Sequence, residues 1–324
     1  NTYMGGVIFS PEERYEKIKF KEMLESNLKR DITGGWAAMI QHYFLAAWIP
    51  EKQTAETYYT AYKQKNVVYT LGFRDKNETV VAPGATQVFS TQLYAGPKDQ
   101  PALEKIAEGL ELTVDYGVLT VIAKPIFWLL THIHSVVGNW GWAIILLTIL
   151  IKAMFYKLSE TSYKSMAKMR GVQPRMVAMK ERFAGDRAGM NKAMMEMYKK
   201  EKINPLGGCL PILVQIPVFI ALYWVLLESV ELRQAPWILW IKDMSASDPY
   251  YILPLLMGVS MFTQQKLNPT PIDPMQAKVM AILPVVFTVF FMFFPAGLVL
   301  YWVVNNVLSI TQQWYITNKV VKAK

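Results

Sequence analysis

The sequence predicts a multi-pass α-helical membrane protein with five spanning helices, a cytoplasmic helical hairpin and an N-terminal β-sandwich domain outside the membrane. Three observations predict this class. Beyond residue 124 the chain contains long stretches without Asp, Glu, Lys or Arg, and one strongly basic block interrupts them. The first 124 residues instead carry balanced charge and mix aromatic and β-branched residues with turn residues. That mixture is typical of short strands.

The uncharged stretches predict the number of spans. A bilayer core about 30 Å thick is crossed by roughly 20 apolar residues in a helix. Backbone exposed to lipid must satisfy its own hydrogen bonds, so these stretches are expected to be helical. The last one holds forty residues with "FFPAG" at its middle, which predicts two spans joined at Pro295. The stretches are Pro125–Ile151, Ile203–Leu227, Pro249–Gln265 and Val279–Asn318.

The charge distribution predicts the orientation. The net charge is +9, and 13 of the 34 Lys and Arg residues lie in Lys152–Lys202. Short basic loops stay on the cytoplasmic side of a membrane. We therefore expect this block inside, and counting spans from it places the N-terminal domain outside and the C-terminus inside. The positive charge is interpreted as a signal of topology and partners, not of direct nucleic-acid reading.

Breaks in hydrophobicity and charge divide the chain into segments. Asn204, Asp248 and Asp273 each precede a proline, a pair typical of a helix start. The expected segments are an outer β-sandwich domain (1–123), an interfacial amphipathic helix (124–139), a first span (140–158), a cytoplasmic coiled-coil hairpin (159–202), a second span (203–227), an outer loop (228–248), a third span (249–266), a cytoplasmic loop (267–274), a fourth span (275–294), a fifth span (296–317) and a cytoplasmic tail (318–324).

The outer domain shows no signal of chemistry. Gly34–Pro50 and Thr86–Pro97 are typical of strands, and Pro101–Glu108 is expected to be helical. The sequence contains no nucleotide-binding loop, no metal-ligand spacing and no catalytic triad. We therefore expect no catalytic residue, cofactor or metal, and favour an accessory scaffold over a sugar- or protein-binding domain.

The basic block has a helical period. Met169, Val172, Met176, Met179 and Phe183 are spaced 3-4-3-4, and after a break come Met190, Met194 and Met197, spaced 4-3. This spacing predicts two helices packed as an antiparallel coiled coil. Methionine-rich faces also suit adaptable binding, and the flanking charge suits an acidic or RNA-bearing partner.

Lys152 is the candidate charge within the membrane. If Gly138-Asn139 ends an interfacial helix and the first span begins near Trp140, that span reaches about Leu158 and places Lys152 in its inner half. The competing register, Trp128–Ile149, leaves the lysine at the interface. The Gly138-Asn139 break favours the buried register. Thr148 lies one turn earlier, on the same helical face.

The last span carries a polar stripe. Its residues are Trp302, Asn305, Asn306, Ser309, Gln312 and Gln313, and other spans add Gln215, Gln264 and Gln265. Polar residues at membrane depth usually face a bundle interior or a wet cavity. We favour a hydrated pocket that is open inside and closed outside, and polar contacts between packed helices are the alternative.

Three long strings carry a family resemblance: Asn204–Trp224, Ser229–Gly258 and Phe294–Asn306. In them, and along essentially all of its length, the chain resembles the YidC-type membrane protein insertases of Gram-negative bacteria, in the YidC/Oxa/Alb family. The resemblance implies a protein that inserts and folds inner-membrane proteins, alone or with the Sec translocon. It implies a five-helix core with a hydrophilic groove open to cytoplasm and lipid.

The resemblance also implies site residues. The family's single positive charge in the groove matches Lys152, where arginine is usual, and Thr148 matches a groove-lining position. Trp302 matches a position that presents an aromatic ring to the substrate helix. The other candidate groove residues are Tyr301, Asn305, Ser309, Gln215 and Gln265.

Partners and location follow from the same resemblance. The implied partners are nascent membrane proteins, the Sec translocon, membrane lipids, and the ribosome and targeting receptor through the cytoplasmic loops. The implied location is the bacterial inner membrane, with a periplasmic N-terminal domain and a cytoplasmic C-terminus. We expect a signal-anchor helix and part of the periplasmic domain to precede residue 1. A scaffold for membrane complexes is the alternative function, because repeats typical of transporters and carboxylate pairs typical of enzymes are not found.

Overall fold

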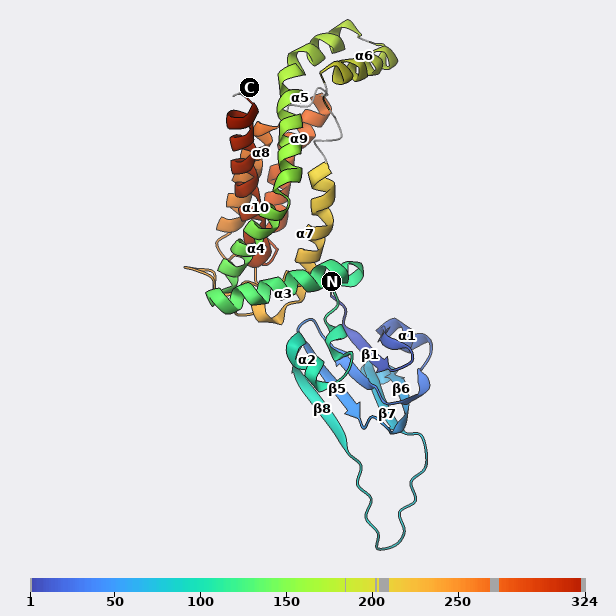
Figure 1. Cartoon of the computed structure of the whole chain (residues 1–324). Helices are drawn as coiled ribbons and strands as arrows, with labels where there is room; N and C mark the ends of the chain where they lie inside the picture. The colour runs from blue at the N-terminus through green and yellow to red at the C-terminus, as the bar shows by residue number, and fades with distance from the viewer. Residues whose placement is uncertain (1, 184, 202, 204–209, 269–273, 322–324) are drawn as a thin grey trace. The chain divides into compact units, whose positions relative to one another are not determined.

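The computed structural model describes the chain except residues 1, 184, 202, 204–209, 269–273 and 322–324 (Figure 1). It contains two compact units. The first comprises Asn1–Gly117 with Glu228–Glu231, and the second comprises Val118–Leu227 with Leu232–Lys324. The expected helix start at Asn204-Pro205 and the one at Asp273-Pro274 lie wholly or partly outside the described residues. Each unit is described by itself.

The first unit is a sandwich of two antiparallel sheets. The larger has the strand order β2-β1-β4-β5-β8, and the smaller has the order β3-β6-β7. The strands of the larger sheet are β1 (Gly5–Ser10), β2 (Arg14–Ile18), β4 (Trp36–Ile40), β5 (Phe44–Pro50) and β8 (Thr91–Pro97). Those of the smaller sheet are β3 (Lys29–Thr33), β6 (Ala55–Lys63) and β7 (Val68–Asp75). The predicted β-sandwich is confirmed, and β1 to β3 are strands that the sequence had not distinguished.

Alternation along the strands gives the larger sheet two apolar faces. One face packs against α2 (Gln100–Ile106) and the turn Leu110–Thr113, around Phe9, Trp36 and Leu103. The other face packs on the smaller sheet and on α1 (Phe20–Glu25), around Ile8 and Tyr58. Because side chains point alternately to the two faces of a strand, neighbouring residues such as Ile8 and Phe9 serve different cores.

A buried ion pair ties Glu228–Glu231 into the first unit. The Lys98 Nζ atom lies 3.1 Å from Glu228 Oε2 and donates to the Thr113 carbonyl at 3.3 Å. The two side chains are 2% and 4% exposed. Removing one partner of such a pair leaves an uncompensated buried charge, which typically costs about 3–5 kcal/mol. The sequence pattern assigned Glu228 only to an outer loop, because the loop's partner lies 130 residues away.

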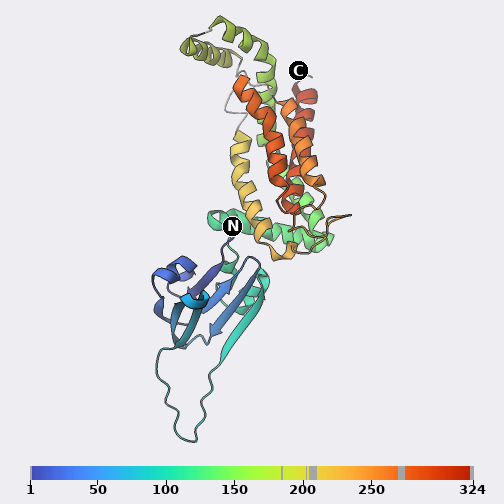
Figure 2. The same ribbon diagram turned by 180° about the vertical axis from the view of Figure 1, so that it is seen from behind.

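The second unit is entirely helical among its described regular elements. Helices α8, α9 and α10 run side by side, and α10 also packs on α4 (Figures 1 and 2). The helices are α3 (Thr120–Val137), α4 (Trp140–Met154), α5 (Tyr156–Arg182), α6 (Arg187–Lys200), α7 (Leu210–Glu228), α8 (Ile252–Leu267), α9 (Pro274–Phe291) and α10 (Ala296–Tyr315), continued by the π-helix Ile316–Val321.

The expected first span, 140–158, is not one straight helix. Asn139 caps α4, its side chain accepting a hydrogen bond from the Trp142 N–H, as the Gly138-Asn139 break predicts. The helix then ends at Met154, and α5 leaves it at an angle of 67°. The bend is at Phe155, whose N–H bonds back to the carbonyls of Ala153 and Ile151. Phe155 has φ −92° and ψ 11°, outside the α-helical region, so the helix ends there and the next one starts in a new direction.

By length and composition, one described helical stretch can cross a membrane by itself, Gly117–Val137. The bent pair α4 and α5 also meets the test if it is counted as one span, while Leu213–Glu228 and Met275–Phe291 are apolar but shorter. Helix α10 has 20 residues, which is long enough, but its Asn, Ser and Gln residues lower its hydropathy. The stretch that the sequence assigned to the interface is thus the most span-like helix of those described.

The basic block forms the helical pair α5 and α6. The buried residues of its hydrophobic core are Val172, Met176 and Ile203. Met169, Met179, Met194, Met197 and Tyr198 pack against them. The 3-4 spacing of methionines therefore identified the contacting faces of both helices. Ile203, which follows the hairpin, completes this small core.

Glu56 makes the stability of the first unit depend on pH. Its side chain on β6 is 4% exposed and pairs in register with Asp75 on β7. Burial, strengthened by the neighbouring Asp75 carboxylate, raises the pKa of Glu56 from 4.5 to about 7. The folded state therefore binds this proton more tightly than the unfolded chain does. Its contribution to stability is fully present below pH 4.5 and is lost as the pH rises through about 7.

We predict that protection of the β6 and β7 amides from hydrogen exchange falls between about pH 5 and pH 8, and that Glu56→Gln removes most of this dependence. Hydrogen-exchange mass spectrometry, corrected for the intrinsic pH dependence of exchange, measures the effect. Glu104→Gln, at an exposed carboxylate on α2, is the matched control. An unchanged pH dependence in Glu56→Gln would show that another group is responsible.

Candidate functional site

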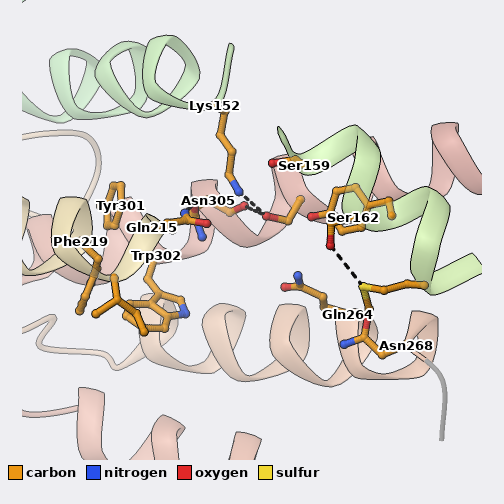
Figure 3. Close-up of a pocket in the computed structure, with 14 residues that line it drawn as sticks. Lys152, Ser159, Ser162, Gln215, Phe219, Gln264, Asn268, Tyr301, Trp302 and Asn305 are labelled. Carbon is orange, nitrogen blue, oxygen red and sulfur yellow. Dashed lines mark hydrogen bonds between the residues drawn. The ribbon is translucent and has the colours of Figure 1, made fainter. Parts of the chain in front are cut away.

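Helices from distant parts of the chain enclose a polar pocket of about 270 Å³ in the second unit (Figure 3). Helix α10 supplies one side, and α4, α5, α7 and the end of α8 supply the rest. The lining residues are Lys152, Ser159, Ser162, Tyr163, Met166, Gln215, Ile216, Phe219, Gln264, Asn268, Tyr301, Trp302, Asn305 and Ser309.

Lys152 supplies the charge of the pocket. Its Nζ atom donates to Ser309 Oγ at 2.7 Å, and Ser309 Oγ in turn donates to the Asn305 carbonyl at 2.7 Å. Figure 3 shows the lysine side chain reaching from α4 toward α10. None of the described residues that line the pocket is an Asp or Glu. An ammonium group that is partly buried without a carboxylate favours the binding of an anion.

The polar stripe of α10 divides between the pocket and helix contacts. Asn305 faces the pocket and its Oδ1 atom accepts from Gln215 Nε2 of α7 at 2.6 Å. Asn306, one residue on, donates instead to Ser260 Oγ of α8 at 2.9 Å. Gln313 donates to the carbonyl of Leu267, the last residue of the same helix α8. Pocket-lining residues and packed polar contacts therefore lie on different faces of one helix, and the hydration of the pocket and its opening toward the cytoplasm stay predictions.

Two expected groove residues do not line the pocket. Thr148 is 1% exposed, and its hydroxyl donates to the Ile144 carbonyl of its own helix. Its short side chain ends there, whereas the lysine one turn later extends into the pocket. Gln264, and not Gln265, lines the pocket. Consecutive side chains of an α-helix point about 100° apart, so the two glutamines do not both face the pocket. Lys152, Trp302, Tyr301, Asn305, Ser309 and Gln215 do line it.

The first turns of α5 line the pocket, which sequence reasoning missed. Ser159, Ser162, Tyr163 and Met166 come from the segment assigned to the cytoplasmic hairpin. The bend at Phe155 directs the start of α5 across the pocket rather than away from it. These four residues are spaced three, one and three positions apart, which places them on one face of a helix. That spacing is the signal in the sequence that could have identified them.

An aromatic wall borders the polar residues. Trp302 lies edge-on to Phe219 of α7, with ring centroids 4.6 Å apart, and 5.1 Å from Phe291 of α9. Phe219 also stacks on Tyr301 at 6.1 Å. Aromatic pairs at such distances add stabilising contacts beyond their buried area. The pocket therefore has a polar, cationic side toward α4 and α5 and an aromatic side toward α7 and α9.

The described structure thus combines a cation-bearing pocket in a bundle of apolar helices with a β-sandwich unit in one chain. The family described as "60Kd inner membrane protein" matches residues 132–323, and "YidC periplasmic domain" matches residues 1–129. The chain therefore belongs to the 60 kDa inner membrane protein family, as the resemblance indicated.

Individual relatives agree with this assignment. The chain is 63% identical to the membrane protein insertase YidC of Thioalkalivibrio sulfidiphilus over 312 residues, which is 96% of this chain and 56% of that protein. It is 61% identical to that of Pseudomonas fluorescens over 322 residues, 99% of this chain and 57% of that protein. The chain thus spans just over half the length of these relatives.

A solved structure shares the fold. It is described as an active YidC insertase crystal structure with the first transmembrane domain resolved. The TM-score is 0.54 at 20% identity, over 96% of this chain and 79% of that chain. At this identity the likeness supports the arrangement of the helices and sheets.

We predict that the pocket is open to water. In protein reconstituted into lipid vesicles with Cys209→Ser, a charged thiol reagent should modify Gln264→Cys at least about tenfold faster than Phe262→Cys, because thiolate forms readily only in a wet environment. Phe262 is the matched control, since it is an exposed apolar residue of the same helix. Mass spectrometry measures the two rates. Comparable slow modification at both positions would show a dry pocket.

Proposed function

We propose that this chain forms the working core of a membrane protein insertase, which inserts and folds inner-membrane proteins through the pocket around Lys152. The observation that carries the proposal is an ammonium group in a polar pocket whose described lining contains no carboxylate. Such a group attracts an anion, and the acidic tail of an incoming membrane protein supplies one. The name of the relatives, membrane protein insertase, supports the same function.

The proposed topology has five spans. Helices α4 and α7 to α10 cross the inner membrane, α3 lies at its outer surface, and α5 and α6 are cytoplasmic. The support is the placement of basic residues in Lys152–Lys202 and the lack of charge in the flanking stretches. The low hydropathy of α10 is compatible with a span, because its polar face lines the pocket and contacts α8 rather than lipid. The N-terminal domain is then periplasmic and the C-terminus cytoplasmic.

The proposed mechanism is electrostatic and has no covalent step. Moving a hydrophilic tail through about 30 Å of hydrocarbon is costly, because its polar groups lose water without gaining partners. A wet pocket in the inner half of the membrane shortens the dry path. Lys152 concentrates acidic tails there, beside the hydrogen-bonded amides of Gln215 and Asn305 that line the same pocket. The new helix then moves along the aromatic side of the pocket into lipid. Burial of its apolar surface there completes insertion.

The proposed cytoplasmic partners are the ribosome and a targeting receptor. The α5–α6 hairpin supports this role, because basic residues surround a small methionine-rich core. A hairpin with a small core is stabilised by few contacts and can adapt to a partner. The Sec translocon is a further proposed partner, on the basis of the family resemblance alone.

Depletion tests the function. Cells depleted of this protein should accumulate a small membrane protein with an acidic periplasmic tail in its uninserted form, because the tail has no wet path across the membrane. Protease mapping measures the fraction of tails that reach the periplasm, and re-expression of the wild-type protein is the control. Normal insertion during depletion would contradict the proposal and favour a scaffolding role.

Lys152 tests the electrostatic step. Lys152→Glu should lower insertion of acidic-tailed substrates by about tenfold and of neutral-tailed substrates much less, because attraction becomes repulsion. Lys152→Arg should be close to neutral, because it keeps the charge, although it changes the hydrogen-bond geometry. The same protease assay measures both. An equal loss for acidic and neutral tails would indicate a structural role for the lysine.

A further inference from the structure

Ser309 is the only described hydrogen-bond partner of the Lys152 ammonium group. The serine is 3% exposed and lies on α10, 157 residues from the lysine in sequence. Its single O–H donor is used by the Asn305 carbonyl at 2.7 Å. Its oxygen accepts from Lys152 of α4.

These bonds orient the serine hydroxyl. A hydroxyl has one donor and two acceptor positions; here the donor is held by the Asn305 carbonyl and one acceptor position by Lys152. The hydroxyl therefore cannot turn to another acceptor without losing its bond to Asn305. Ammonium, by contrast, has three donors. One points to Ser309, and the other two have no acceptor among the described residues.

We propose that Ser309 is a positioning residue that fixes the Lys152 ammonium group on the α10 side of the pocket and thereby selects acidic over neutral substrate tails. This inference rests on the proposed function and deepens it. With one donor held by the serine, the two remaining donors are available to the two oxygens of a carboxylate. A lysine without this anchor has several rotatable bonds and spreads its charge over a larger volume, which weakens selection.

A matched comparison separates positioning from helix packing. Thr311 lies two residues further along α10 and makes the same kind of back-bond, with its hydroxyl donating to the Val307 carbonyl at 2.9 Å. Thr311 is exposed and does not line the pocket. Thr311→Ala therefore removes a hydroxyl from the same helix without touching the lysine.

The experiment compares Ser309→Ala, Ser309→Thr, Thr311→Ala and Lys152→Gln in the full protein. The readout is the ratio of insertion of an acidic-tailed substrate to that of the same substrate with a neutral tail, at matched protein levels. Ser309→Ala should lower this ratio roughly threefold to tenfold, as expected for the net loss of one ordinary hydrogen bond. Ser309→Thr should restore it, because the hydroxyl is kept, and Thr311→Ala should leave it unchanged.

Each outcome decides a different point. If Lys152→Gln lowers the ratio and Ser309→Ala does not, the positioning role is wrong and the proposed function is unaffected. A ratio that none of the variants lowers would overturn the electrostatic step of the proposed function itself. Equal losses in Ser309→Ala and Thr311→Ala would assign the effect to packing of α10. A general loss of insertion for both tails with an unchanged ratio would also contradict the inference.

Discussion

The function proposed for the helical core depends on the ammonium group of Lys152, which has no carboxylate among the described residues that line its pocket. Lys152 enters a pocket built by α4, α5, α7, α8 and α10, and one serine hydroxyl holds it there. Leaving a cation partly buried is unfavourable unless water or an anion shares the site. This unfavourable free energy is the physical origin of the proposed affinity for acidic tails, because a carboxylate of the tail would neutralise the lysine charge.

The first unit also contains a buried lysine, but this one has a carboxylate partner. The Lys98 side chain is 2% exposed, and its ammonium group contacts Glu228 and donates to the Thr113 carbonyl. The paired lysine therefore has a structural role, whereas the unpaired one is available for binding. Within one chain, one buried lysine therefore has a carboxylate partner, and the other is proposed to gain one from a bound substrate tail.

Regular patterns made most of the fold predictable. The mixture of aromatic, β-branched and turn residues identified the regions of β4, β5 and β8, and the Met169–Met179 spacing identified the hairpin contact. Strands β1 to β3 were not distinguished, because short polar strands such as Arg14–Ile18 resemble loops until a neighbour pairs with them. The bend at Phe155 was also missed, since no proline or glycine marks it in the sequence.

Local composition was sufficient to predict helices with almost no charged residues, one lysine near the end of the first of them, and a stripe of amides and hydroxyls on the last. Helical period alone placed Trp302, Asn305 and Ser309 on one face. Tertiary packing decided the rest, because neighbours one residue apart, such as Asn305 and Asn306, face different helices. Packing also selected Gln264 over Gln265, excluded Thr148, and brought the start of α5 to the pocket. Sequence specifies which polar groups exist, and only the assembled bundle determines which of them meet.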